Sequence, residues 1–245
     1  MGEVKGVLLC GGEGTRLHPL TKVANKHLQR IGRKVMLDYP LEKMIEAGIN
    51  KFHIIVGGEN WSQVVKYCGS GKDRGIDISY SIQDQAGGIA EAIGLAKTFA
   101  GNDKICVILG DNMFDQSIRV NVKEFDECGF PSQAVLFTRR VDDPSRFGVL
   151  VRNKVGQPSD VIEKPKTDHG NEIITGIYMF TPDVFDIIKT IQPSARGELE
   201  VSDLNRWYVQ GGCSKVVDLK GNWTDCGTFE SLNEAERIVR ERNGQ

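Results

Sequence analysis

A glycine-rich segment near the N-terminus has the residue types and spacing best suited to binding phosphate. Residues 9–17 read Leu-Cys-Gly-Gly-Glu-Gly-Thr-Arg-Leu and close a short apolar run. Glycines let backbone N–H groups approach phosphate oxygens closely, and an arginine can hold two of those oxygens in a fork. Arg16 supplies the guanidinium, and Lys26 supplies a second positive charge. The segment therefore predicts a phosphate-binding loop.

Two other phosphate-binding patterns fit the chain poorly. The dinucleotide-binding motif needs a third glycine where Leu17 stands, which disfavours a nicotinamide-dependent dehydrogenase. Residues 69–72 read Gly-Ser-Gly-Lys, but Asp73 follows and the leading glycine of a Walker motif is missing. We interpret residues 69–72 as a turn.

The composition favours a small-molecule partner. The chain has 245 residues, 40% of them hydrophobic, and a formal charge of -2 with no polybasic segment, so we expect no nucleic-acid or membrane partner. Its apolar runs are far shorter than the ~20 residues of a membrane-spanning helix. The first residues lack the pattern of a secretory signal, which predicts a cytoplasmic protein. Six widely spaced cysteines indicate neither a disulfide framework nor a zinc site.

The first half of the chain alternates short apolar strands with amphipathic helical patterns, which predicts an α/β fold with a parallel sheet and crossover helices. Gly48 is expected to end the first of these helices. The expected strands and helices, in chain order, cover residues 4–10, 36–47, 52–56, 61–67, 78–82, 89–99 and 105–109.

After about residue 130 the pattern changes to closely spaced strands without a full crossover helix between them. This change predicts an antiparallel or mixed extension of the sheet. Thr181 and Pro182 are typical of a helix start and predict a helix over residues 183–191 with Thr181 as its N-cap. No repeat or flexible linker divides the chain. The strands expected in this half cover residues 134–138, 148–152, 161–163 and 174–180.

Residues 11–21 match the signature Gly-Gly-x-Gly-Thr-Arg-Leu-x-Pro-Leu-Thr, with Asn25-Lys26 at the usual distance. On these residues the chain resembles the sugar-phosphate nucleotidyltransferases, and within them it is most similar to the bacterial glucose-1-phosphate thymidylyltransferases. The resemblance covers nearly the whole chain. Further matching segments are Gln83 with residues 86–90, then residues 109–112, 143–149, 163–165, 175–178, 193–200 and 223–228.

The resemblance implies a Rossmann-like mixed sheet flanked by helices, with an integrated sugar-binding lobe, in one domain of residues 1–245. Residues 1–130 would mainly bind the nucleotide, residues 131–228 would mainly bind the sugar phosphate, and residues 229–245 would form a C-terminal helix. The implied reaction is in-line attack by glucose 1-phosphate on the α-phosphorus of dTTP, with release of pyrophosphate. It depends on Mg²⁺, positioning and charge neutralisation and needs no covalent intermediate.

The resemblance also carries site roles onto matching residues. Asp111 and Asp225 would hold Mg²⁺, for which carboxylate oxygens are suitable ligands; judged alone, each would be an ordinary turn residue. The implied catalytic residues are Arg16, Lys26, Asp111, Lys164 and Asp225. The nucleotide would contact Leu9, Gly11, Gly12, Gly14, Thr15, Arg16, Gln83, Gly88 and Asp111. The sugar phosphate would contact Lys26, Asn112, Gly148, Glu163, Lys164, Ile174, Arg196 and Trp223.

The chain departs from the family pattern at a few places. His27 stands where many members have glutamine, and Val35 replaces a frequent proline; we expect the His27 ring to face solvent or to be capped. After Thr228 a single helical stretch runs to Arg242, whereas longer members continue with elements that help form a regulatory site. We therefore expect no feedback control, or control at a differently built site. The resemblance also suggests a homo-oligomer.

Three other functions remain as alternatives. The first is a uridylyltransferase that uses UTP, because one hydroxyl on the nucleotide changes binding little and an apolar pocket rejects an added hydroxyl by only roughly a hundredfold. A non-catalytic nucleotide-binding module would lack the charged residues that this chain retains. A metal-dependent glycosyltransferase typically has an Asp-x-Asp triplet, where this chain has Asp111-Asn112-Met113.

Overall fold

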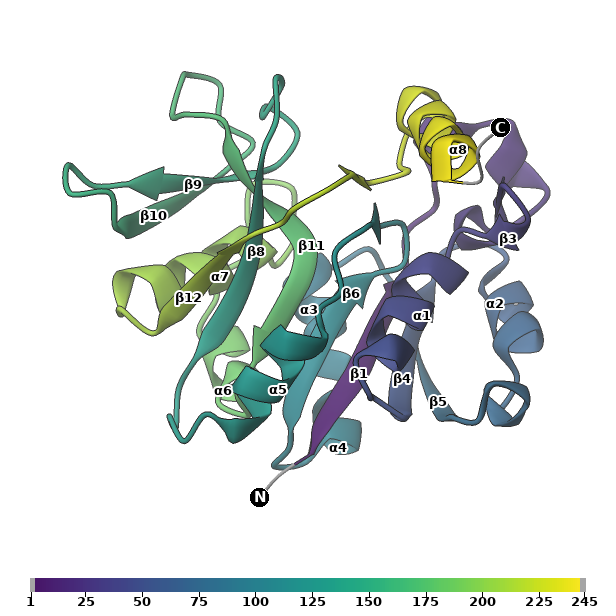
Figure 1. The fold of residues 1–245 in the computed structure, drawn as a ribbon, viewed down its shortest axis with the longest axis horizontal. Helices are drawn as coiled ribbons and strands as arrows, with labels where there is room; N and C mark the ends of the chain where they lie inside the picture. The colour runs from purple at the N-terminus through teal and green to yellow at the C-terminus, as the bar shows by residue number, and fades with distance from the viewer. Residues whose placement is uncertain (1–2, 243–245) are drawn as a thin grey trace.

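A nine-stranded mixed sheet runs through the structure, which is a computed structural model describing residues 3–242 (Figure 1). Four parallel strands form one side of it in the order β5-β4-β1-β6. They are β1 (Val4–Cys10), β4 (Lys51–Gly57), β5 (Asp77–Gln83) and β6 (Lys104–Leu109). The helices between them are α1 (Asp38–Glu46), α2 (Trp61–Cys68), α3 (Ile89–Leu95) and α4 (Lys97–Ala100).

The second half extends this sheet with mostly antiparallel strands, as predicted. The long strand β11 (Glu172–Phe180) pairs antiparallel with β6, β8 and β9, and its pairing with β8 is irregular between Ile174 and Tyr178. Strands from both halves thus belong to one sheet, and the single domain of residues 1–245 stays a prediction. The added strands are β8 (Ala134–Arg140), β9 (Gly148–Arg152), β10 (Pro158–Glu163) and β12 (Ser214–Asp218).

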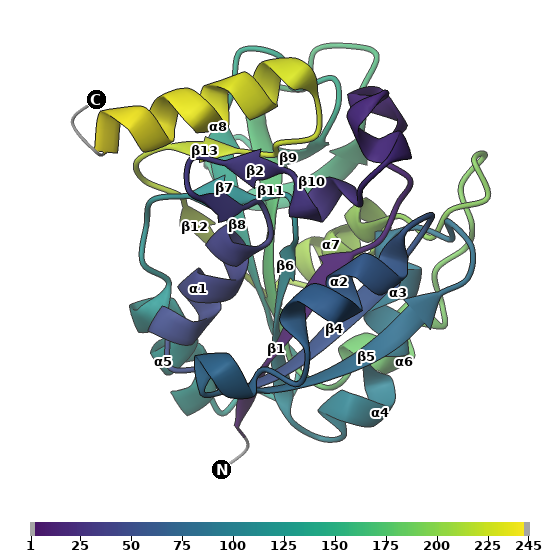
Figure 2. The same ribbon diagram turned by 90° about the vertical axis from the view of Figure 1, so that its right-hand side faces the viewer.

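Helices cover both faces of the sheet (Figures 1 and 2). Side chains alternate along β1, so Val7 and Leu9 enter one core with α3, whereas Leu8 and Cys10 enter the other with α1. This two-sided burial explains the continuous apolar run at the N-terminus. The remaining helices of the two layers are α6 (Val184–Ile188) and α7 (Val201–Gln210) on the first face, and α2 and α5 (Arg119–Glu127) on the second.

A small third core lies beneath the C-terminal helix α8 (Phe229–Arg242), which crosses over β2 and β13 in Figure 2. β13 (Trp223–Thr224) pairs with β7 (Met113–Phe114), and β2 (Arg30–Ile31) pairs with β3 (Lys34–Val35). The core contains Ile31, Met36, Met113, Cys226, Ala235, Ile238 and Val239. This packing brings residues near 225 beside the end of β6.

Several local predictions can now be compared with the structure. Gly48 does end α1, with φ 95° and the hydrogen bonds Gly48 N to Ile45 O and Ile49 N to Met44 O. The Thr181 cap was wrong, because the Thr181 hydroxyl bonds to Gln133 O and Asp183, and α6 begins at Val184.

Other elements differ in extent or were missed. The helix expected over residues 89–99 is divided at Ala96 into α3 and α4, and Gly94, a poor helix former, lies in the last turn of α3. Helices α5 and α7 and strand β12 were not predicted.

All six cysteines are free, and four of them are buried. Across residues 3–242, no helix is both long and apolar enough to cross a bilayer. Residues 243–245 of the expected C-terminal helix lie outside the described residues.

Candidate active site

The candidate site lies where the order of the parallel strands in the sheet reverses. From β1 the chain continues to β4 on one side, whereas β6 pairs with the other side of β1. Ligands of open α/β sheets bind outside the carboxyl ends of the strands at such a switch point. The glycine-rich loop follows β1 and Asp111 follows β6, so both lie there.

A cavity of about 760 Å³ opens at this point. Every residue predicted for the site lines it, which brings residues from positions 9 to 225 around one space. They are Leu9, Gly11, Gly12, Gly14, Thr15, Arg16, Lys26, Gln83, Gly88, Asp111, Asn112, Gly148, Glu163, Lys164, Ile174, Arg196, Trp223 and Asp225. The Gly-Ser-Gly-Lys segment at residues 69–72 forms a turn before the 3-10 helix Lys72–Arg74 and does not line the cavity.

The glycine-rich loop is closed by contacts that only glycine permits. Gly14 has φ 65° and precedes the 3-10 helix Thr15–Leu17. Its carbonyl oxygen accepts the Thr21 hydroxyl at 2.8 Å. A Cβ at position 14 would lie 3.1 Å from Lys26 Cβ. The loop therefore packs closely against Lys26, which lines the cavity.

Asp111 and Lys26 form an ion pair inside the cavity. Lys26 Nζ lies 2.7 Å from Asp111 Oδ2, and Asn112 Nδ2 donates to Asp111 Oδ1 at 3.0 Å. Burial alone would raise the pKa of Asp111, but the charge of Lys26, with His27 and these hydrogen bonds, holds that pKa below its usual value. Asp111 is therefore an ionised carboxylate at neutral pH.

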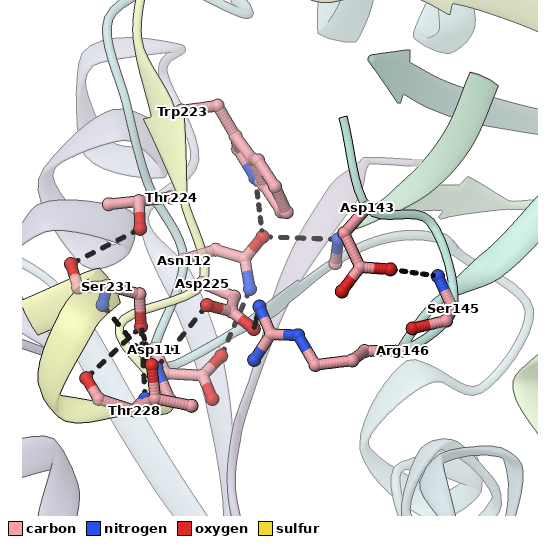
Figure 3. Close-up of polar contacts among 12 residues, drawn as sticks. Asp111, Asn112, Asp143, Ser145, Arg146, Trp223, Thr224, Asp225, Thr228 and Ser231 are labelled. Atoms are coloured by element: carbon pink, nitrogen blue, oxygen red, sulfur yellow. Dashed lines mark hydrogen bonds and ion pairs between the residues drawn. The ribbon is translucent and has the colours of Figure 1, made fainter. Parts of the chain in front are cut away.

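Asn112 fixes the position of Asp111. Its side chain is buried, and its Oδ1 accepts Trp223 Nε1 at 2.8 Å (Figure 3). The same oxygen accepts Gly176 N at 3.1 Å. Both the oxygen and the nitrogen of the Asn112 amide therefore have hydrogen-bond partners within the protein. The direct sugar-phosphate contact that we expected of Asn112 stays a prediction, and Asn112 does line the cavity.

Asp225 faces the same space from the other end of the chain, and Figure 3 shows it beside Asp111 and the Arg146 guanidinium. Arg146 Nη2 lies 3.6 Å from Asp225 Oδ2. Arg16 is also near, since a Cβ at Gly227 would lie 3.2 Å from Arg16 Nη2 and 3.5 Å from Asp225 Oδ2. Sequence analysis gave Arg146 no role, although it lies within a matched segment.

The far end of the cavity is built around Glu163. Its carboxylate accepts the Ser202 hydroxyl at 2.5 Å and lies 3.2 Å from Lys164 Nζ and 3.6 Å from Arg196 Nη2. Gly148 pairs with Glu163 across β9 and β10, and a Cβ on Gly148 would lie 2.4 Å from Ser202 Oγ. Gly148 therefore leaves the room that Ser202 needs to reach Glu163.

Arg196 is held by a carboxylate that sequence analysis overlooked. Its Nη2 donates to both oxygens of Glu200, at 2.8 and 2.9 Å, and Ser194 Oγ donates to Glu200 Oε1 at 2.7 Å. Glu200 and Ser202 lie at the start of α7, the helix that was not predicted. The available signal was the helical spacing of the apolar residues Val201 and Leu204.

Gly88 owes its identity to the backbone. It has φ 98°, and a Cβ there would lie 2.4 Å from the Leu199 carbonyl oxygen. Leu199 N donates to Gly87 O at 2.7 Å and Ala90 N donates to Leu199 O at 3.1 Å. Close approach of a base is therefore not needed to explain this glycine, although Gly88 lines the cavity.

The His27 ring is buried and does not face solvent, whereas the other expected state, a capped ring, agrees with its contact to the Asn25 side chain. Its backbone N–H and Nδ1 both contact Asn25 Oδ1, at 3.0 and 2.9 Å. Burial and then the charge of Lys26 lower the pKa of His27 from 6.5 to about 3. The ring is therefore neutral at physiological pH.

The two aspartates fit a magnesium ion bridged to phosphate. Within residues 3–242, no cluster of three or more His, Cys, Asp or Glu side chains forms a complete metal cage. Asp111 and Asp225 supply hard carboxylate oxygens with side-chain exposures of 12% and 16%. Magnesium binds well through one or two carboxylates, with phosphate and water completing its octahedron.

Comparison with known proteins agrees with this geometry. A relative from Neisseria meningitidis serogroup A, a glucose-1-phosphate thymidylyltransferase, is 38% identical over 97% of this chain and 83% of its own length. A Bacillus anthracis structure, provisionally named a glucose-1-phosphate thymidylyltransferase and complexed with sucrose, has TM-score 0.90 and 43% identity, covering 97% of this chain and 96% of that one.

A UDP-glucose pyrophosphorylase complexed with UDP-glucose shares the fold, with TM-score 0.84 and 24% identity over 98% of this chain and 99% of that one. The family model for nucleotidyl transferases matches residues 5–242. This match, over nearly the whole chain, means that the chain belongs to the nucleotidyl transferase family.

Proposed function

We propose that the protein transfers a thymidylyl group from dTTP to glucose 1-phosphate and releases pyrophosphate. One observation carries the proposal: a single cavity extends from the glycine-rich loop to the Glu163–Lys164–Arg196 cluster. Two phosphorylated substrates can therefore meet in one space near Asp111. The names of the relatives support dTTP and glucose 1-phosphate as the pair.

In this proposal the nucleotide lies along the glycine-rich loop. Backbone N–H groups of residues 11–15 and the Arg16 guanidinium bind the triphosphate, and Gln83 reads the base. Lys26 neutralises charge near the reacting phosphate. Gly12 has φ 89°, and among residues 3–242 no atom would lie within 4 Å of a Cβ at this position. The turn is therefore open, which supports this use of the loop.

The sugar phosphate takes the other end of the cavity. Lys164 and Arg196 bind its phosphate, and the Glu163 carboxylate accepts hydroxyl hydrogens of the hexose. Ser202 keeps Glu163 in place through its 2.5 Å hydrogen bond. The Trp223 and Ile174 side chains provide apolar walls. The Trp223 ring packs edge-on against the Phe147 ring, with the two ring centroids 5.7 Å apart.

Asp111 and Asp225 would hold Mg²⁺, which neutralises charge on the phosphate oxygens of the substrates when bound. The protein's own contribution is to orient two polyanions for in-line displacement at the α-phosphorus. Asn112 and Trp223 keep Asp111 in position, and Lys26 and Arg16 stabilise charge that develops on the phosphates. No side chain needs to form a covalent intermediate.

Pyrophosphate release tests the proposal. Purified protein with Mg²⁺ is assayed with dTTP, UTP, CTP, ATP and GTP against the 1-phosphates of glucose, galactose, mannose and N-acetylglucosamine. The expected maximum is dTTP with glucose 1-phosphate, and the signal requires both substrates. A maximum at UTP would assign uridylyl transfer instead. Silence of folded protein across the whole set would favour a non-catalytic binding module.

A homo-oligomer and a cytoplasmic location stay predictions from the sequence. Light scattering at several protein concentrations tests the first. Fractionation of cells that express the tagged chain tests the second.

A further inference from the structure

Gln83 ends strand β5 at the cavity, and its side-chain amide is held by two acceptors. Its Nε2 donates to the Gly88 carbonyl oxygen at 3.1 Å and to Oε2 of Glu91, in the first turn of α3. Gly87 leaves space for that carboxylate, because a Cβ on Gly87 would lie 3.0 Å from Glu91 Oε2. One end of the Gln83 amide is therefore surrounded by oxygen acceptors.

These acceptors decide which way the amide points. The nitrogen and oxygen of a glutamine amide are distinguished by their partners, and only the NH₂ group can face a carbonyl and a carboxylate. The Gln83 oxygen consequently lies on the opposite side, where a Cβ on Gly11 would be 2.8 Å away. Among residues 3–242, no donor reaches this oxygen. Both Gln83 and Gly11 line the cavity.

We propose that Glu91 is a positioning residue that orients the Gln83 amide and thereby selects nucleobases that carry an imino N–H. Glu91 does not itself line the cavity, so it acts through Gln83. The inference rests on the proposed use of this cavity by a nucleoside triphosphate.

The selectivity follows from donor and acceptor chemistry. Thymine and uracil present N3–H, which can donate to the Gln83 oxygen, whereas the N3 of cytosine is an acceptor. Two acceptors that face each other in a closed site leave both unsatisfied, which weakens binding of cytosine. Without Glu91 only the Gly88 carbonyl oxygen still holds the NH₂ group, so the amide can turn over more readily and present its NH₂ group to cytosine. The contact of Glu91 with Gln83 therefore discriminates thymine and uracil from cytosine, but it does not discriminate thymine from uracil.

Equilibrium binding of dTTP and dCTP tests the inference without requiring turnover. Calorimetric titrations with Mg²⁺ are made on the wild type, Glu91→Ala, Glu91→Gln and Glu124→Ala. Glu124 is an exposed control whose carboxylate contacts Lys215 Nζ. We expect Glu91→Ala to lower the ratio of the dCTP Kd to the dTTP Kd on the order of tenfold. Glu91→Gln keeps an oxygen acceptor and most of the ratio, and Glu124→Ala keeps all of it.

An unchanged ratio in Glu91→Ala, or equal weakening of both nucleotides, would overturn the inference. Thermal unfolding of each variant verifies that it is folded. Wild-type pyrophosphate release from dTTP and glucose 1-phosphate is measured in parallel. Absent turnover together with a lowered ratio in Glu91→Ala contradicts the proposed function alone, whereas normal turnover with an unchanged ratio contradicts only the role of Glu91.

Discussion

Lys26 and Asp111 form a nearly enclosed ion pair, with Nζ 2.7 Å from Oδ2 and side-chain exposures of 14% and 12%. Removing one partner of such a pair leaves an uncompensated charge where little water can solvate it. The pair also keeps the Asp111 carboxylate ionised and aimed at the cavity. Its neighbours, Asn112 and Trp223, hold it from the other side.

Asp111→Asn should lower turnover far more than nucleotide binding. The substitution keeps the shape but removes the charge next to the reacting phosphates, so the expected loss in kcat is on the order of a hundredfold or more. Asp218→Asn, an exposed control on β12, should leave kcat unchanged. Pyrophosphate release and dTTP titration measure the two quantities. Near-normal turnover of Asp111→Asn with magnesium would remove this residue from the site.

Removal of divalent metal should abolish pyrophosphate release, and added Mg²⁺ should restore it. Asp225→Asn should raise the Mg²⁺ concentration that gives half-maximal activity, because one of two carboxylate ligands has lost its charge. A magnesium titration at saturating substrates measures this shift. Unchanged magnesium dependence of Asp225→Asn would argue that Asp225 is not a ligand.

Gly148→Ala should weaken sugar-phosphate binding selectively. The new Cβ would lie 2.4 Å from Ser202 Oγ and would push that hydroxyl away from Glu163. We expect the KM for glucose 1-phosphate to rise on the order of tenfold, the scale of one lost hydrogen bond to a charged group, with the KM for dTTP nearly constant.

Two further variants sharpen this test. Gly129→Ala is the matched control, since no atom lies within 4 Å of a Cβ there. Combined with Ser202→Ala, Gly148→Ala should cost nothing beyond Ser202→Ala alone, because the clashing hydroxyl is gone. Additive losses would contradict the proposed contact.

The buried His27 should make the fold less stable in acid. Its pKa falls from 6.5 to about 3 on folding, so between these values the unfolded chain holds a proton that the native chain lacks. The contribution of His27 to the free energy of unfolding is fully present above pH 6.5. It decreases as the pH falls below this value, by up to about 1.4 kcal/mol per pH unit.

His27→Gln removes this titration. Between pH 7.5 and pH 5 the wild type should lose about 2 kcal/mol more stability than His27→Gln. Urea unfolding at both pH values measures the difference. His169→Gln, which changes an exposed ring, should behave like the wild type. Equal pH dependence of the wild type and His27→Gln would mean that folding does not lower the pKa of His27.

Much of the fold could be predicted from local sequence. Apolar runs such as residues 4–10 specify buried parallel strands, because hydrophobic residues fill both faces. Gly48 marked a helix end through its left-handed backbone. Local signals were also available but not used at the divided helix, where Gly94 precedes Ala96, and at α7, where residues 201 and 204 are apolar.

The candidate site divides in the same way. The sequence by itself determined the residue types of the phosphate-binding loop, the two aspartates and the basic residues, because their motifs are local. Only the tertiary structure brought Arg146 to Asp225, Ser202 to Glu163 and Glu91 to Gln83. Two of these contacts join different elements far apart in sequence, and the third crosses a loop. Their distances are therefore set by sheet order and helix packing rather than by spacing along the chain.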